Sequence, residues 1–143
     1  MTASAARVAL IHATALAIEP ISEAFTRLWP DIERLNLLDD RLSQDRARDG
    51  CLTAAMGERF QALARYALSA GADAILFTCS AFGPAIEAVA ASLAVPVLKP
   101  NEAMFEQALA GGSRIGLVYG QMNEPPGARL RVSADRPRPA RAA

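Results

Sequence analysis

Hydrophobic and polar residues alternate along the chain in a way that predicts short strands separated by longer amphipathic helices. Apolar runs typical of buried parallel strands occupy 8–11, 32–38, 73–78 and 95–98, and a further run at 114–118 predicts a fifth strand. Each run is followed by turn-forming or polar residues, so the strands are expected to end where the apolar residues end.

The segments between the runs carry apolar residues at helical spacing. Pro20 suits the first turn of a first helix, and Pro84 opens another that extends to Leu93. Between them, an apolar stripe predicts a helix that ends at Gly71 and is formed by Leu52, Met56, Phe60, Leu63 and Ala67. Asn101 can cap a last helix, which stops at 111–112. The charged stretch 38–50, LDDRLSQDRARDG, is expected to be a loop.

This alternation of strand and helix with short links predicts an α/β fold. We expect a parallel sheet of four to five strands, flavodoxin-like and flanked by helices on both faces. The pattern breaks after Val118. We therefore expect one α/β domain over 1–118 and a Pro/Arg-rich tail over 119–143 that is largely disordered.

Composition narrows the class of protein. The 143 residues have no net charge, which gives no reason to expect a nucleic-acid partner or a membrane surface. No stretch is long enough to span a membrane, and His12 interrupts the apolar run near the amino terminus, which argues against a signal peptide. Two cysteines without zinc-like spacing indicate a reducing cytoplasm and no metal site.

Cys79 is the main candidate for chemistry. In ILFTCSAFGPAIEA, residues 75–88, the thiol follows an apolar strand and precedes a small-residue loop and a helix. Open α/β sheets bind ligands at the carboxyl ends of their strands, and a nearby helix amino terminus favours the thiolate as base or nucleophile. The alternative is a small core residue. Ala85 stands where a phosphatase loop needs Arg, and no nucleotide-binding glycine loop occurs.

Other polar residues are expected at the same edge. His12, the only histidine, ends the first strand and is either an auxiliary acid or base or a structural group. Cys51, at the start of a predicted helix, is interpreted as structural. Short hydroxyl and amide side chains that could hold a substrate carboxylate lie at predicted strand ends: Thr14, Thr78, Ser80 and Asn101.

Four segments in this order resemble the amino-terminal half of the aspartate/glutamate/hydantoin racemase family, from residue 7 to about 118: IHATALAIEPI, NLLDD, ILFTCSAFGPAIEA and VPVLKPNEAMFEQAL. The resemblance implies an isomerase that needs no cofactor. Its small substrate carries a carboxylate or related group, as in an amino acid or hydantoin. One thiol removes the α-proton and a second returns a proton on the opposite face. Cys79 matches the first thiol, Ser80 and its loop would bind the carboxylate, and Thr14 and Asn101 would line the pocket.

The same resemblance implies a second domain that carries the second thiol, and Cys51 does not match it. We therefore expect a truncated chain, as a fragment, fusion or frameshift product, in which proton exchange on one face survives better than racemisation. Residues 118–132, VYGQMNEPPGARLRV, resemble a short segment of the β subunit of F-type ATP synthase. No Walker A loop accompanies them, so no ATPase activity is inferred.

Two other functions fit the sequence. A single essential thiol also serves decarboxylation or cis-trans isomerisation in the same superfamily. The second alternative is a non-catalytic remnant or interaction module that forms a homodimer through surface left uncovered.

Overall fold

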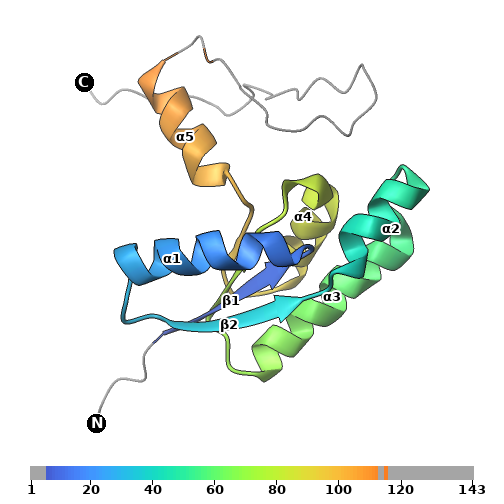
Figure 1. Cartoon of the computed structure of the whole chain (residues 1–143), viewed down its shortest axis with the longest axis horizontal. Helices are drawn as coiled ribbons and strands as arrows, with labels where there is room; N and C mark the ends of the chain where they lie inside the picture. The colour runs from blue at the N-terminus through green and yellow to red at the C-terminus, as the bar shows by residue number, and fades with distance from the viewer. Residues whose placement is uncertain (1–5, 113–114, 116–143) are drawn as a thin grey trace.

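A four-stranded parallel sheet forms the centre of the protein in the computed structural model, which describes residues 6–112 and 115 (Figure 1). The strands lie in the order β2-β1-β3-β4. Their bounds are β1 Arg7–His12, β2 Glu33–Leu38, β3 Ala74–Phe77 and β4 Val97–Leu98. The α-helices are α1 Ile18–Leu28, α2 Arg41–Asp49, α3 Ala54–Ser69, α4 Gly83–Ser92 and α5 Glu102–Gly111, and 3₁₀ turns span Ala15–Ala17 and Ser80–Phe82.

The central strand β1 pairs with β2 on one side and β3 on the other, and helices bury both of its faces. Its Val8 and Leu10 pack with Ile32 against α1, while its Ala9 and Ile11 belong to the larger core on the opposite face. This burial explains why the run reads as continuously apolar.

The larger core lies between the sheet and the helices α2, α3 and α4. Phe60 of α3 is its aromatic centre, with ring centroids 5.1 Å from Phe77 of β3 and 4.9 Å from Phe82. Phe82 belongs to the 3₁₀ turn that precedes α4. Helices therefore cover both faces of a parallel sheet, which confirms the predicted α/β fold.

The expectation that residues 38–50 form a loop is wrong, because Arg41–Asp49 is the helix α2. Leu42, 1% exposed, is its only buried residue, so the segment lacks the apolar stripe that would reveal a helix. Ion pairs replace that stripe, with Asp45 bound by Arg41 at i−4 and Arg48 at i+3. Gly50 ends the helix in the left-handed conformation, at φ 66°.

Smaller differences affect the edges of the elements. Asn101 occupies the predicted cap position of α5, but it has φ 66° and its side chain makes no capping hydrogen bond. Cys51, interpreted as structural, is exposed, because it lies in the surface link between α2 and α3. The predicted strand at 114–118, apart from Ile115, and the tail over 119–143 lie outside the described residues.

The last helix stands apart from the sheet. Figure 1 shows α5 projecting away from the body that the sheet and the other helices form. Leu98 of β4 and Met104 of α5 are each about half exposed. Among the described residues, none of the helices has both the length and the apolarity needed to cross a bilayer.

Candidate functional site

The strand order places a candidate site at the carboxyl edge of the sheet, between β1 and β3. The chain leaves β1 to form β2 on one side and later forms β3 and β4 on the other. In open α/β sheets the crevice at this reversal is where ligands bind. His12 and Thr14 lie at the end of β1, while Thr78 and Cys79 follow β3.

Cys79 occupies the N-cap position of the 3₁₀ turn Ser80–Phe82, which leads directly into α4. Its side chain is partly buried and packs against the larger core. Neither the turn nor α4 has a capping hydrogen bond from a side chain, and Pro84 lies in the first turn of α4. The positive end of the helix therefore faces the segment that carries the thiol.

His12 is fully buried and hydrogen-bonded through both ring nitrogens. Nδ1 lies 2.8 Å from the Thr78 hydroxyl, and Nε2 lies 2.9 Å from Oδ1 of Asn36 on β2. Thr78 also lies 3.3 Å from the carbonyl of Ile11. The ring thus connects the three adjacent strands β2, β1 and β3.

Thr14 and Ser80 occupy two different settings. Thr14 is partly buried, and its hydroxyl accepts a hydrogen bond of 3.4 Å from the amide of Leu16, so it caps the 3₁₀ turn Ala15–Ala17. Ser80 is exposed as the first residue of the turn after Cys79. Both residues lie at the carboxyl edge, Thr14 after β1 and Ser80 after β3.

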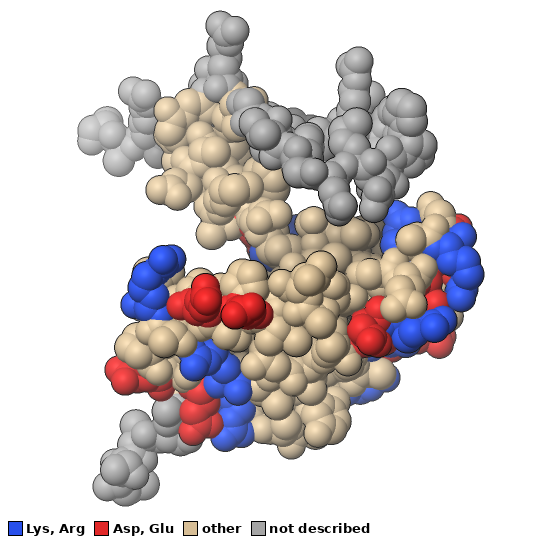
Figure 2. Space-filling model, in the orientation of Figure 1, with Lys and Arg blue, Asp and Glu red and all other residues tan. Residues whose placement is uncertain are grey.

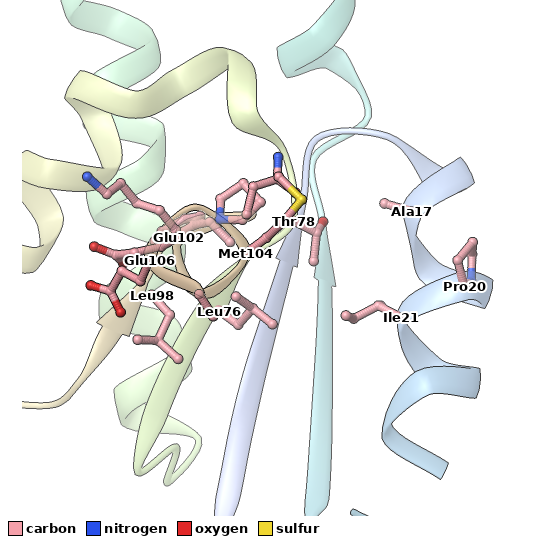
Figure 3. A pocket seen from close by; sticks show the side chains of 14 residues that line it. Ala17, Pro20, Ile21, Leu76, Thr78, Leu98, Glu102, Met104 and Glu106 are labelled. Atoms are coloured by element: carbon pink, nitrogen blue, oxygen red, sulfur yellow. The ribbon is translucent and has the colours of Figure 1, made fainter. Parts of the chain in front are cut away.

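A hollow of about 920 Å³ opens on the sheet face that α1 covers only in part (Figure 3). Thr78 and Asn101 line it, together with apolar side chains of the sheet and of the helices α1 and α5 that include Leu76, Ile21 and Met104. Its described lining does not include Cys79, Ser80 or Thr14. Thr78 is therefore the predicted site residue that joins the strand-end edge to this hollow.

Acidic side chains outnumber basic ones in the described lining of the hollow. Glu102 and Glu106 of α5 contribute carboxylates, as Figure 3 shows. Lys99, the one cation in this described lining, lies 2.9 Å from the carboxylate of Glu87, which offsets its charge. Around Glu102 the hollow consequently favours a neutral or cationic group over an anionic one.

An ion-pair network secures the loop at the end of β2. Arg59 of α3 forms a bidentate contact with Asp39, at 2.8 and 2.5 Å, and a 2.7 Å bond with Asp45. The bond from Arg59 is the main reason that the pKa of Asp45 lies below its ordinary value, and Asp39 and Asp45 raise the pKa of Arg59. In Figure 2 the charged side chains of α2 gather at the right of the molecule.

Sequence analysis did not identify Asn36 or the Asp39–Arg59 pair. One signal was available for Asn36, because a polar amide inside a predicted strand, directly before an apolar pair, is unusual. Nothing in the sequence indicated that it would meet His12, since the two residues are 24 positions apart. In the described part of the chain, no group of three or more His, Cys, Asp or Glu side chains is arranged to hold a metal ion.

Comparison with known protein families identifies this fold and edge. The family model described as Asp/Glu/Hydantoin racemase matches residues 10–123, which is most of the chain and includes the end of β1, Cys79 and the whole candidate edge. The match agrees with the resemblance carried by the strand-end segments, and the four-stranded parallel sheet is consistent with it. The protein belongs to the Asp/Glu/hydantoin racemase family.

Proposed function

We propose that this protein catalyses cofactor-independent proton transfer at the α-carbon of a small carboxylate substrate, with Cys79 as the acid/base. The family is one of racemases, which supports an isomerase of the racemase or epimerase type. The observation that carries the proposal is the position of Cys79 at the N-cap of the 3₁₀ turn that leads into α4, at the reversal of the strand order.

This position suits the reaction because the α-proton of a carboxylate substrate is removed by a base, and negative charge must be stabilised nearby. The amide N–H groups at the start of α4 favour negative charge on the sulfur and on a bound carboxylate. Partial burial of Cys79 against the core fixes the side chain while leaving part of it accessible.

The residues proposed to contact the substrate carboxylate lie at the same carboxyl edge of the sheet as Cys79. In this proposal Ser80 and its loop bind the carboxylate, with Thr14 beside them at the end of β1. Asn101 lies at the hollow's lining, where it can contact the remainder of the substrate. His12 has both nitrogens engaged inside the protein, which supports a positioning role rather than direct contact with substrate.

Complete inversion needs an acid on the face opposite the base. The only other cysteine, Cys51, is exposed in the link between α2 and α3, which gives no reason to assign it this role. We therefore propose that the chain exchanges the α-proton on one face more readily than it inverts the centre. Decarboxylation or cis-trans isomerisation through Cys79 alone is the second candidate, favoured by this single thiol at the edge.

The test uses solvent deuterium uptake. The protein is incubated in D₂O with D- and L-aspartate, D- and L-glutamate, a hydantoin and an arylmalonate, and uptake is followed by NMR together with optical rotation. We expect uptake with at least one substrate, a loss of about 10² to 10⁴-fold in Cys79→Ser, and little change in the matched control Cys51→Ser. Arylmalonate consumption instead would support the decarboxylase.

No uptake or turnover with any member of this panel would remove the proposal. The remaining reading would then be a non-catalytic module that forms a homodimer, and light scattering would distinguish a dimer from a monomer. The cytoplasmic location expected from the cysteines stays a prediction.

A further inference from the structure

The three side chains Asn36, His12 and Thr78 form a row across β2, β1 and the end of β3. Asn36 is exposed, His12 is fully buried, and Thr78 is partly buried and lines the hollow. The row therefore runs from solvent, through a buried imidazole, to a hydroxyl at the candidate site.

The positions of the hydrogens follow from the atoms in contact. Asn36 presents Oδ1, which can only accept a hydrogen bond, so Nε2 of His12 carries a hydrogen. In the neutral ring Nδ1 is then an acceptor, and the Thr78 hydroxyl donates to it over 2.8 Å. In the charged ring Nδ1 donates to Thr78, whose hydrogen then turns to the Ile11 carbonyl at 3.3 Å.

In the charged ring the Thr78 hydrogen would be held only by the 3.3 Å contact with the Ile11 carbonyl, which already accepts a hydrogen bond from the Thr78 amide, so it could turn to a ligand. In the neutral ring the Thr78 hydroxyl keeps its bond to Nδ1 only if it accepts, rather than donates, toward a ligand. Its hydrogen points into the protein, and a lone pair remains for a donor outside. Donation to a substrate carboxylate would withdraw the hydrogen from Nδ1 of a fully buried ring, and a buried acceptor without a partner is strongly unfavourable.

The charges around Thr78 favour the same kind of ligand group. The hollow that it lines also holds the carboxylate of Glu102, while Lys99 is paired with Glu87. An ammonium or amide N–H is attracted to such surroundings, and a carboxylate is repelled. The helix amino terminus after Cys79, at the other side of the edge, instead attracts an anionic group such as a carboxylate.

We propose that Thr78 is a specificity-determining residue that accepts a hydrogen bond from the nitrogen on the α-carbon of the substrate, and that His12 and Asn36 hold it in this role. The inference rests on the proposed function and replaces the carboxylate contact predicted for Thr78. This hydrogen bond to Thr78 makes the site selective for amino acids and cyclic amides over carboxylic acids that lack the nitrogen.

The first test is independent of any ligand. His12 is the only histidine, so the long-range ¹H–¹⁵N correlation spectrum of the full chain reports its ring alone. We expect Nε2 protonated and Nδ1 unprotonated. A hydrogen on Nδ1, in a neutral or a charged ring, would free the Thr78 hydrogen for a ligand and would overturn the proposal.

The second test compares binding of matched ligands by calorimetry: aspartate with succinate, and glutamate with glutarate, which differ only in the α-nitrogen. The isosteric Thr78→Val variant lacks the acceptor, and Thr78→Ser is the control that retains it. We expect the wild type to prefer the nitrogen-bearing member, and Thr78→Val to lose roughly tenfold to a hundredfold of that preference. Thr78→Ser should keep most of it.

The outcomes separate this inference from the proposed function. Binding of aspartate or glutamate with an unchanged preference in Thr78→Val overturns the role of Thr78 and leaves Cys79 chemistry intact. Failure of all four ligands to bind, together with no deuterium uptake from the wider panel, overturns both.

Discussion

The two cysteines occupy settings that should make them chemically distinct. Cys51 is exposed in a surface link, whereas Cys79 is partly buried against the core at the start of the turn before α4. A modifying reagent must reach the sulfur, so accessibility separates the two residues before any difference in nucleophilicity is considered. A substrate bound at the proposed site should shield only Cys79 from the reagent.

We predict that a bulky, water-soluble maleimide labels Cys51 faster than Cys79, and that a bound substrate slows labelling of Cys79 alone. Mass spectrometry of the digested protein measures each site separately, with the Cys51→Ser variant as the control that isolates Cys79. Equal protection of both cysteines by the substrate would place the ligand elsewhere or indicate a general change in structure.

At the scale of elements, α2 shows how ion pairs can maintain a helix that has one buried apolar residue. Asp45 is the central acceptor, because Arg59 of α3 and Arg41 and Arg48 of α2 all bind it. Its side chain is 14% exposed, so solvent screens these contacts less than it would on an open surface.

We predict that Asp45→Asn destabilises the protein at neutral pH and that its difference from the wild type shrinks in acid. The pKa of Asp45 is lowered in the folded protein, chiefly by Arg59, from an ordinary value of 3.8. The stabilising contribution is therefore complete well above pH 3.8 and is lost as the pH falls through the lower folded value. Urea unfolding at a series of pH values measures the difference in unfolding free energy between Asp45→Asn and the wild type.

The matched control is Asp31→Asn. Asp31 is an exposed carboxylate before β2 that makes no ion pair within the described ranges, so its removal should change stability little at any pH. A difference for Asp45→Asn that stays constant from neutral pH to pH 2 would show that the ion pairs are not its source.

At the scale of the whole molecule, one aromatic cluster connects the sheet to the helices that carry the site. Phe60 of α3 contacts Phe77, at the end of β3, and Phe82, in the turn before α4. Since Cys79 lies between these two residues in the chain, the cluster determines where the thiol sits relative to the sheet. Core packing and site geometry therefore depend on the same side chains.

We predict that Phe60→Ala lowers the free energy of unfolding by about 3–5 kcal/mol, because a ring that is 2% exposed leaves a cavity. Tyr66→Ala on the same helix, where the side chain is 58% exposed, should change it by less than about 0.5 kcal/mol. Urea unfolding followed by circular dichroism measures both. Similar losses in the two variants would mean that burial in the aromatic cluster does not set the cost.

The sequence by itself determined the elements whose pattern is local. Apolar runs and helical stripes predicted the four described strands and the helices around them, because burial on one face or on both leaves a periodic trace in the chain. The position of Cys79 after a buried strand followed from the same pattern, and the family resemblance was carried by short contiguous segments. The charged helix α2 was missed because its stabilising contacts are ion pairs, which leave no apolar period.

Only the tertiary structure decided which distant side chains meet. Asn36 and His12 lie in two strands and Thr78 follows a third, so their contact depends on strand order and register, which sequence spacing does not encode. The same holds for Arg59, which reaches Asp39 across 20 residues. Hydrogen bonds and ion pairs depend on distances of a few ångströms between atoms. These distances arise from packing of the whole sheet, and for that reason the proton arrangement at Thr78 could not be inferred from the sequence.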